Sequence, residues 1–205
     1  MTSFGVVARV RRVLSQQAGK KVKVGHCGTL DPFATGLLII VTGTECRNAG
    51  LYSKLDKVYE ATLELGKTST TGDPEGELRE GTDIVPMEQA IIHAMQTLTG
   101  EIEQVPPIYS AIKIDGQRAY KHARAGRDIV MQPRPVTIFS LELVEYQYPF
   151  VTFRTHVSSG TYIRTLAEDI GKALGTGAYL TQLRRTKIAD FDIAGAVPLE
   201  KYMAL

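Results

Sequence analysis

The sequence predicts an α+β fold with a largely antiparallel or mixed sheet. The predicted strands come in groups and do not alternate with helices, which is the pattern of α+β proteins and not of parallel βαβ units. Residues 161–174 carry a stripe of apolar side chains at helical spacing, so an amphipathic helix is expected beside the sheet. The chain of 205 residues shows no internal repeat, low-complexity segment or clear linker, so we expect a single domain.

Glycine, proline and hydrophobic periodicity mark the elements of the first half of the chain. Thr2-Ser3 can cap a helix with apolar residues along one side, and Gly19 is expected to end it. Lys57–Leu65 alternates as a strand does, and the segment 68–78 after it has the composition of a loop. The other elements expected here are a strand at 37–42, a short helix at 46–55 and a helix at 87–98 closed by Gly100.

The second half predicts a hairpin turn, a basic helix and then two adjacent strands. A turn is expected at Asp115-Gly116, and the helix at 117–125 should end at Gly126. Tyr148-Pro149 lies near the turn between the two strands. The expected elements from there on are strands at 135–146 and 150–158, the helix at 161–174 ended by Gly175, a strand within 178–193 and a helical turn at 198–203.

The composition is that of an ordinary soluble globular protein, with 43% hydrophobic and 22% charged residues. The chain contains no apolar run of the length that a transmembrane helix needs, so no membrane partner is expected. Two cysteines, Cys27 and Cys46, form no disulfide framework and fit a reducing, cytoplasmic compartment. The four histidines show no ligand spacing and no CxxC motif exists, so no metal site is expected.

Basic residues gather in three segments although the net charge is only +2. Such patches are what a polyanionic partner would need, and they are equally typical of solvated helix faces. The first thirty residues contain no acid, which is also a property of mitochondrial transit peptides. The three groups are Arg9, Arg11, Arg12, Lys20, Lys21 and Lys23; Lys113, Arg118, Lys121, Arg124 and Arg127; and Arg184, Arg185 and Lys187.

Two glycine motifs invite nucleotide-binding interpretations, and both fail on spacing. Gly66-Lys67-Thr68 looks like the end of a phosphate-binding loop, but the position of the required earlier glycine is Ala61. Gly28 and Gly36 do not have the spacing of a dinucleotide fingerprint. The sequence therefore predicts neither a nucleotide nor a dinucleotide cofactor.

Asp31 is the one carboxylate in a stretch full of Gly, Thr and Pro, and two interpretations of it stay open. Because Asp31 precedes Pro32, it can cap a turn of helix at 32–35. It can also be a catalytic carboxylate that the loop holds in place. The two are compatible, since a cap geometry also fixes a carboxylate.

Arg164 and Tyr59 each have a structural and a catalytic interpretation. Arg164 lies in the first turn of the helix at 161–174, where it can pair with Glu168 one turn on. Alternatively it pairs with a carboxylate from elsewhere in the fold and keeps that acid ionised. Tyr59 lies in a predicted strand, where core packing is ordinary, yet an aromatic ring is also what a flipped-out base needs for stacking.

Six segments in order resemble the TruB-type tRNA pseudouridine synthases, and the resemblance covers nearly the whole chain. Any one of the segments alone would be weak, and their common order and spacing make the match strong. They are "KVGHCGTLDPFATGLLIIVTG", "KVYEATLELGKTSTTGDPEGEL", "QVPPIYSAIKIDGQRAYKHARAG", "RPVTIFSLELVEY", "SGTYIRTLAEDIG" and "AYLTQLRRTKIADF".

The resemblance implies an enzyme that isomerises the T-loop uridine of tRNA, at tRNA position 55, to pseudouridine. It implies a mixed, mostly antiparallel sheet flanked by helices, with a thumb-like RNA-binding insertion at about 101–134, in a catalytic domain spanning 1–205. It implies no organic cofactor and no metal, tRNA as the partner, and a monomer. The chemistry agrees, because moving the ribose bond from N1 to C5 of uracil changes no oxidation state.

The resemblance also assigns roles to individual residues. Asp31, in "GTLDP", matches the essential aspartate, and Tyr59 and Arg164 match an active-site tyrosine and arginine. His26, in "GHCG", matches a histidine linked to base flipping and RNA contact. The remaining expected substrate- or RNA-binding residues are Asp73, Tyr162 and Leu183, and Lys113, Arg118, Lys121 and Arg124 of the insertion.

Two features of the family pattern are expected to be missing. Family members begin with a strand containing "K-P-x-G" before the Thr-Ser pair, which here is Thr2-Ser3, and bacterial relatives continue into a small C-terminal RNA-binding domain of the PUA-like kind. Two alternatives stay open. One is a guide-RNA-dependent pseudouridine synthase, which shares the "GTLDP" loop. The other is a catalytically inactive RNA-binding protein or tRNA chaperone on the same scaffold.

Overall fold

The computed structural model describes residues 1–110, 112–114, 116–127 and 129–200, which form two compact units. Unit 1 comprises Met1–Tyr59 and Leu183–Leu205, and unit 2 comprises Glu60–Gln182. The chain passes between them inside two strands, β4 (Lys57–Leu65) and β12 (Ala178–Ile188). Because both crossings lie within regular strands, no linker composition marks the division in the sequence.

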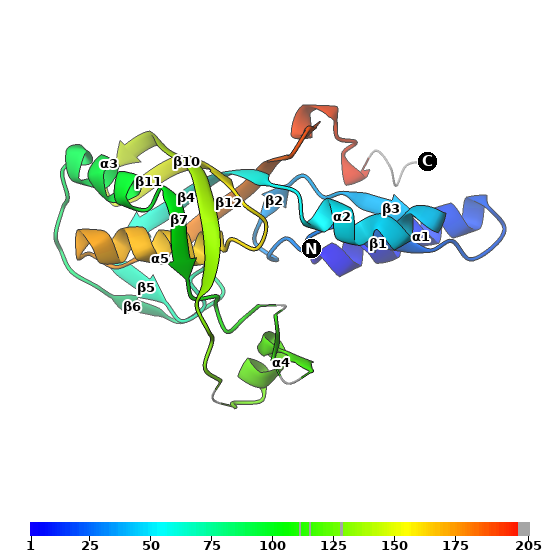
Figure 1. Cartoon of the computed structure of the whole chain (residues 1–205), viewed down its shortest axis with the longest axis horizontal. Coiled ribbons are helices and arrows are strands. Elements are labelled where there is room, and N and C mark those ends of the chain that lie inside the picture. The colour runs from blue at the N-terminus through cyan, green and yellow to red at the C-terminus, as the bar shows by residue number, and fades with distance from the viewer. Residues whose placement is uncertain (111, 115, 128, 201–205) are drawn as a thin grey trace. The chain divides into compact units, whose positions relative to one another are not determined.

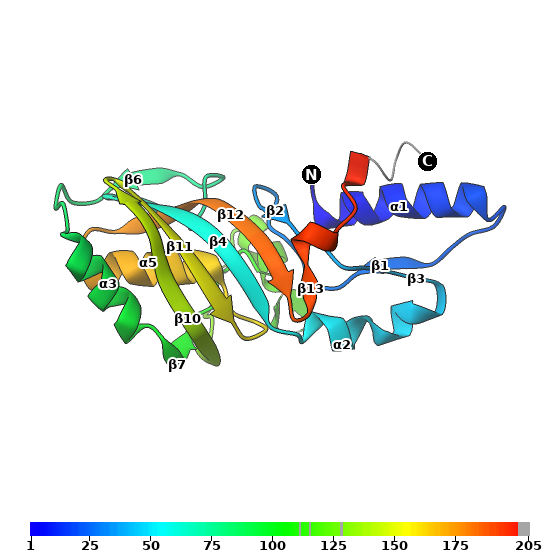
Figure 2. The same ribbon diagram turned by 90° about the horizontal axis from the view of Figure 1, so that it is seen from above.

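Unit 1 is built on a helix and a two-stranded sheet. Helix α1 (Ser3–Gln17) begins as predicted, with the Thr2 hydroxyl accepting a hydrogen bond from the Gly5 N–H at 3.1 Å. The helix packs against β1 (Val24–His26), which pairs antiparallel with β3 (Ile40–Thr42), as Figure 2 shows. Val7 and Val10 are the buried apolar side chains of the helix, so its apolar side forms part of the unit 1 core.

The segment 37–42, predicted to be one strand, is a strand only at its end. Leu37 instead donates its backbone N–H to the Arg185 carbonyl at 2.8 Å, and the short strand β2 (Thr35–Gly36) pairs in parallel with β12. The prediction failed because Leu37 bonds to Arg185, a residue far away in the sequence, which a local pattern cannot reveal. The predicted helix at 46–55 is present as a 3₁₀ turn, η1 (Gly43–Asn48), followed by α2 (Ala49–Ser53).

The remaining part of unit 1 follows β12. β13 (Phe191–Asp192) pairs antiparallel with the end of β12, and a single 3₁₀ turn follows at η2 (Ile193–Gly195). Residues 199 and 200 of the helical turn predicted at 198–203 are helical, and residues 201–203 lie outside the described part of the chain.

Unit 2 contains a mainly antiparallel sheet flanked by helices, as Figure 1 shows, and confirms the predicted α+β class. Its strands follow the order β12-β4-β11-β10-β7. β4 has the bounds predicted from its alternation, and every second residue along it is buried. β10 (Arg134–Gln147) pairs antiparallel with both β11 (Phe150–Val157) and β7 (Gly100–Gln104), and residues 148–149 form the predicted turn.

Two helices of unit 2 pack together, and one of them carries site residues. α3 (Glu88–Thr97) contacts α5 (Ile163–Leu174) and β10. The predicted apolar stripe of α5 is buried at Ile163, Leu166, Ala167 and Ile170, and Gly175 ends the helix in the left-handed region at φ 69°. A hairpin of β5 (Lys67–Ser69) and β6 (Leu78–Glu80) holds the predicted loop between its strands.

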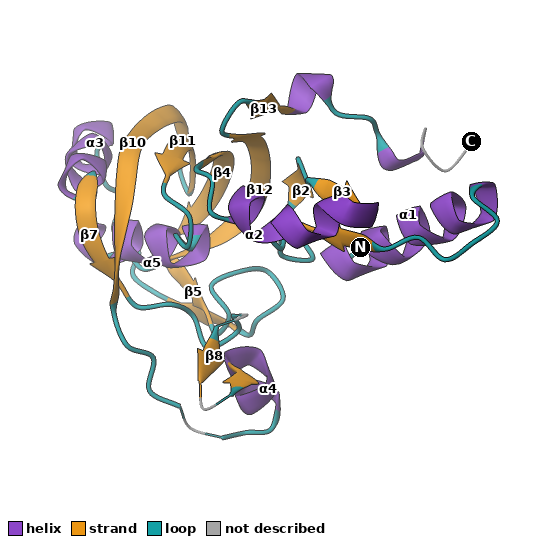
Figure 3. Ribbon diagram, turned by 45° about the vertical axis from the view of Figure 1, so that its right-hand side comes forward, coloured by secondary structure: helices purple, strands orange, loops and turns teal. Residues whose placement is uncertain are grey.

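The predicted insertion leaves the unit 2 sheet and returns to it between two paired strands. Gln104 at the end of β7 pairs with Arg134 at the start of β10, so residues 105–133 lie between these neighbouring positions. The segment contains the hairpin of β8 (Lys113–Ile114) and β9 (Gln117–Arg118) and then α4 (Ala119–Arg124), which Figure 3 shows beyond the sheet. Of the predicted turn, Gly116 has φ 81° and Asp115 lies outside the described residues.

Within the part of the chain that the structure describes, no helix is long and apolar enough to span a bilayer. The described residues also contain no group of three or more His, Cys, Asp or Glu side chains that could hold a metal ion.

The Ser3 side chain connects α1 to the glycine-rich loop, and its loss should lower stability. Its hydroxyl accepts from the Leu30 N–H at 2.8 Å and donates to the Leu30 carbonyl at 3.2 Å. Ser3→Ala should lower the free energy of unfolding by about 1–2 kcal/mol, measured by urea titration. The control is Ser53→Ala, whose hydroxyl donates only to Gly50 in its own helix and whose loss should cost less. Equal effects would contradict the connecting role of Ser3.

Candidate active site

The glycine-rich loop of unit 1 places Asp31 at the start of a tight turn. The loop leaves β1 with the Cys27 N–H donating to the Ile39 carbonyl at 2.9 Å, and Ser3 then holds Leu30. The turn is closed by the Ala34 N–H, which donates to the Asp31 carbonyl at 3.0 Å, and β2 follows at once. A turn therefore begins at Asp31 as predicted, but the helical turn expected at 32–35 does not form, because residues 35 and 36 pair with β12 in an extended form.

A buried arginine of β12, Arg185, holds this loop on both sides of Asp31. Its side chain is only 1% exposed, and its Nε–H donates to the Leu37 carbonyl at 2.8 Å while Nη2 donates to the Gly28 carbonyl at 3.2 Å. The backbone of Arg185 also lies against Gly36, where a Cβ atom would be 2.2 Å from the Arg185 carbonyl oxygen. Only glycine fits there, so the approach of loop and strand is fixed by both side chain and backbone.

Tyr59 lies beside the same arginine and within electrostatic reach of Asp31. It is a buried residue of β4, and burial is the main cause that raises the pKa of its phenol. The charge of Arg185 and a hydrogen bond from it lower the pKa of Tyr59, whereas the negative charge of Asp31 raises it. Unit 1 thus brings together the predicted catalytic residues Asp31 and Tyr59, with Arg185 as an additional neighbour.

The other predicted unit 1 residues lie on the strands that frame the loop. His26 is half-buried in β1, opposite Ile40 of β3, and Leu183 is buried in β12. Lys57, at the start of β4, is also buried, and its ammonium donates to the Ser53 carbonyl at 2.7 Å and to that of Leu55. Burial, and then the charge of Arg185, lower the pKa of Lys57 to about 8.

In unit 2 the predicted catalytic Arg164 forms a buried ion pair with Asp73. Nη1 of Arg164 lies 3.2 Å from Oδ2 of Asp73, and the side chains are 5% and 4% exposed. Nη1 also donates to the Thr71 carbonyl at 2.9 Å and Nη2 to the Tyr109 carbonyl at 3.0 Å. Arg164 therefore pairs with a carboxylate from a distant loop, which is one of the two expected arrangements. Burial raises the pKa of Glu168, and the charge of Arg164 lowers it less than that of Lys172 does.

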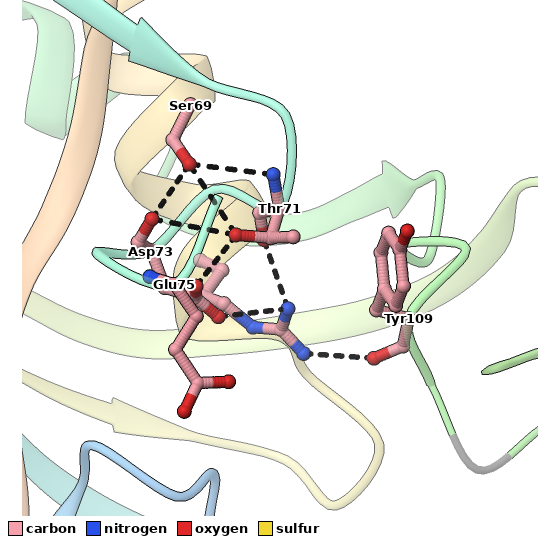
Figure 4. Close-up of polar contacts among 6 residues, drawn as sticks. Ser69, Thr71, Asp73, Glu75 and Tyr109 are labelled. Carbon is pink, nitrogen blue, oxygen red and sulfur yellow. Dashed lines mark hydrogen bonds and ion pairs between the residues drawn. The ribbon is translucent and has the colours of Figure 1, made fainter. Parts of the chain in front are cut away.

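Asp73 is held by its own loop as well as by the arginine. Oδ1 of Asp73 accepts from the Thr71 hydroxyl at 2.6 Å and from the Glu75 N–H at 3.0 Å, and the Ser69 hydroxyl donates to the Asp73 carbonyl at 2.6 Å. Figure 4 shows these loop side chains gathered on one side of a guanidinium, with the Tyr109 carbonyl on the other. The loop between β5 and β6 is thus shaped to present one carboxylate to the guanidinium.

The start of α5 is positioned by a glutamine that sequence reasoning missed. The amide side chain of Gln104, at the end of β7, accepts from the Tyr162 N–H at 2.7 Å and donates to the Tyr162 carbonyl at 3.1 Å. Tyr162, a predicted RNA-binding residue, is the residue before α5, which carries Arg164 in its first turn. Gln104 is only 2% exposed, and its position directly before "VPP" was the one available signal of its role.

The predicted RNA-binding residues of the insertion present their charges to solvent where they are described. Lys113, Arg118 and Lys121 are all exposed, and Arg124 lies in α4 with a side chain outside the described part of the structure. The insertion is held internally by the Ala119 N–H, which donates to the Ile112 carbonyl at 2.7 Å. Exposed basic side chains on a segment with its own hydrogen bonds can contact phosphates without disturbing the sheet.

The buried Arg164–Asp73 pair should be costly to break. Asp73→Asn should lower the free energy of unfolding by about 3 kcal/mol, because the guanidinium stays buried with only carbonyl partners. The matched control is Glu60→Gln, which breaks the Arg154–Glu60 pair of 2.7 Å with 53% and 39% exposed side chains. That change should cost less than about 0.5 kcal/mol. Similar losses for both variants in urea titrations would contradict the buried pair.

Comparison with known proteins identifies the family. A model described as TruB family pseudouridylate synthase (N terminal domain) matches residues 11–163, and one described as tRNA pseudouridylate synthase B C-terminal domain matches residues 164–204. The chain is 44% identical over 201 residues to tRNA pseudouridine synthase B of Syntrophotalea carbinolica and 46% identical over 200 residues to that of Azoarcus sp.. These alignments cover 98% of this chain and 64% and 65% of the relatives, so the chain spans less than two thirds of their length.

Solved structures agree with the sequence relatives. A chain in the crystal structure of the archaeal box H/ACA sRNP Nop10-Cbf5 complex aligns over 100% of this chain and 50% of its own length, with a TM-score of 0.70 and 28% identity. A chain in the crystal structure of a Cbf5-Nop10-Gar1 complex aligns over 94% of this chain and 46% of its own, with a TM-score of 0.68 and 31% identity. With the aspartate of "GTLDP" and the arginine of "GTYIRT" in place, the chain belongs to the TruB family of pseudouridylate synthases.

Proposed function

We propose that the protein isomerises a uridine in the T-loop of tRNA, at tRNA position 55, to pseudouridine. The observation that carries the proposal is Asp31, which begins a turn clamped by Arg185 and lies within electrostatic reach of the buried Tyr59. A single fixed carboxylate next to an aromatic ring suits a reaction on one flipped-out base. The named relatives, which are tRNA pseudouridine synthases B, support tRNA as the substrate.

The proposed reaction balances within the substrate. The bond between N1 of uracil and the ribose breaks, the uracil rotates, and a bond forms between C5 and the same ribose carbon. The hydrogen on C5 leaves as a proton and N1 gains one, so nothing is oxidised or reduced. In its ionised form Asp31 serves as the nucleophile or the base at the ribose.

The environment of Tyr59 favours stacking over proton transfer. Because burial raises the pKa of its phenol, Tyr59 carries its proton at neutral pH and is a weak base. We therefore assign Tyr59 the role of a neutral aromatic platform for the uracil. His26 fills the position from which the base is withdrawn in this proposal.

Arg164 is the third catalytic residue of the proposal, and its guanidinium is ordered before any substrate binds. The carbonyls of Thr71 and Tyr109 and the carboxylate of Asp73 together fix its plane. A planar cation held in this way can orient an anionic group without reorganising during the reaction. Asp73 then acts on the reaction through Arg164, and Tyr162 and Leu183 complete the assigned substrate contacts.

The insertion supplies the proposed grip on the T-arm. Its exposed residues Lys113, Arg118 and Lys121, together with Arg124, would contact phosphates as a monomer binds one tRNA.

The free cysteines Cys27 and Cys46 support a reducing compartment, and we place the protein in the cytoplasm on that ground. The curated relatives do not favour the alternative of a guide-RNA-dependent synthase. The experiment below distinguishes the proposed enzyme from an inactive RNA-binding protein.

The proposed activity is tested on an unmodified tRNA transcript. Wild-type protein should convert the T-loop uridine to pseudouridine, mapped by mass spectrometry of nuclease fragments, and Asp31→Asn should leave it unchanged. The asparagine matches the aspartate in shape but cannot act as a nucleophile or base. A transcript with the T-loop uridine replaced by cytidine is the substrate control.

Each outcome of that experiment decides between the candidates. Binding of the transcript without conversion by the wild type would favour the inactive RNA-binding protein. Conversion only when a guide RNA is added would favour the guide-dependent alternative. Conversion by Asp31→Asn at the wild-type rate would remove Asp31 from the mechanism.

The insertion should contribute affinity that depends on salt. Replacing Lys113, Arg118 and Lys121 with alanine should weaken tRNA binding at least tenfold and reduce the slope of log affinity against log salt by about 2. The control with the same change in charge replaces Lys67, Arg154 and Lys172, which already pair with neighbouring acids. Filter binding at several salt concentrations measures the affinity and its salt dependence for both variants. An equal loss of tRNA affinity in the two triple variants would show a general effect of charge and no specific contact between the insertion and tRNA.

A further inference from the structure

A buried arginine outside the assigned catalytic set connects the parts of unit 1 on which the proposed reaction depends. Arg185 lies in β12, where the side chains of Leu183, Arg185 and Ile188 are buried and those of Arg184 and Lys187 are exposed. In the sequence it was one member of a basic run. In the structure its guanidinium is among the most completely buried side chains of the chain, with 1% exposure.

The hydrogen bonds of Arg185 enclose the Asp31 turn. Gly28 precedes Asp31 and Leu37 follows it, and the carbonyls of both accept from the one guanidinium, at 3.2 Å and 2.8 Å. The Leu37 N–H returns a bond of 2.8 Å to the Arg185 carbonyl. A shift of either end of the loop would therefore break a bond to Arg185.

The same guanidinium also acts on Tyr59. Its charge, and then its hydrogen bonding, lower the pKa of the phenol, whereas the negative charge of Asp31 raises that pKa. Arg185 also opposes the charge of the buried Lys57, so β12 places a second cation close to one that is already desolvated. Asp56 acts on Lys57 in the opposite direction. The charged and titratable groups of unit 1 that influence this region are thus Asp31, Asp56, Lys57, Tyr59 and Arg185.

Burying this guanidinium costs free energy, and a purely structural role would not require a cation at this position. Apolar side chains of similar volume usually fill such a position at equal or better stability, because the guanidinium must be stripped of water. A guanidinium differs in that its planar fork can bind several acceptors at fixed angles. A lysine ammonium is a single point of charge on a flexible stem and cannot donate in two fixed directions to the carbonyls of Gly28 and Leu37.

We propose that Arg185 is a positioning residue for the proposed isomerisation, which fixes the Asp31 turn from both ends and sets the orientation of the Tyr59 phenol. It touches neither the base nor the ribose and acts through these two residues. Displacing a reacting group by about 1 Å commonly costs on the order of a hundredfold in rate. Changes at Arg185 should therefore slow the chemical step and leave RNA binding nearly intact.

The rate test rests on the proposed function and uses single-turnover conversion of tRNA with excess enzyme. Arg185→Lys should lower the rate about 10- to 100-fold and change the Kd for tRNA less than about threefold. The matched control is Arg154→Lys in β11, an exposed arginine paired with Glu60, which should keep the wild-type rate. A wild-type rate for Arg185→Lys, or a loss of affinity in place of rate, would overturn the proposal.

A second test needs no activity and uses a variant that keeps the arginine. In isotope-edited NMR of the wild-type protein, the Nε–H of Arg185 should exchange slowly with water because it is buried and bonded to Leu37. Tyr59→Phe removes the phenol oxygen and should shift the guanidinium signals of Arg185 but not those of Arg154. Rapid exchange in the wild type, or unchanged Arg185 signals in Tyr59→Phe, would overturn the positioning role even if the wild type converts tRNA. Failure of the wild type to convert tRNA, with these signals as expected, would count against the proposed function alone.

Discussion

The contact between the Arg185 guanidinium and the carbonyls of Gly28 and Leu37 is the constraint on which the unit 1 site depends. It fixes a loop that has few side chains of its own to pack. Around it, the parallel pairing of β2 with β12 leaves room only for glycine at position 36, and Ser3 holds Leu30 from the other side. The Asp31 carboxylate is therefore placed by its neighbours' backbone, which explains how a stretch of glycine, threonine and proline can support precise chemistry.

In unit 2 a second buried arginine also fixes an irregular loop. Arg164 pairs with Asp73 and donates from Nη1 and Nη2 to the carbonyls of Thr71 and Tyr109, and Gln104 fixes the backbone from which α5 begins. In both units a planar guanidinium ties an irregular loop to a regular strand or helix. A buried cation is costly unless it is paired and hydrogen-bonded, so each arginine and its loop must be ordered together.

The sequence predicted elements that depend on local pattern and failed where distant partners decide. The alternation of β4 gave its bounds, and Thr2 and Gly175 marked helix ends correctly, because capping and burial of one face are local. The helical turn predicted after Asp31 does not form, because β12 pairs with the residues that follow it. Arg185 was missed because nothing in a run of basic residues shows which one is buried, and the acid that pairs with Arg164 could not be named because Asp73 lies far away in sequence. The three residues assigned to catalysis came from family resemblance, and the structure supplies their surroundings.

Release of tritium from tRNA labelled at C5 of uridine measures the proposed isomerisation directly. Forming a bond from C5 to the ribose expels the C5 hydrogen, so each isomerised uridine releases its label to water. We expect the wild type to release one equivalent of label per tRNA, from the T-loop uridine, and Asp31→Asn to release none while still binding the RNA. Binding without release by the folded wild type, or release by Asp31→Asn at the wild-type rate, would contradict this expectation.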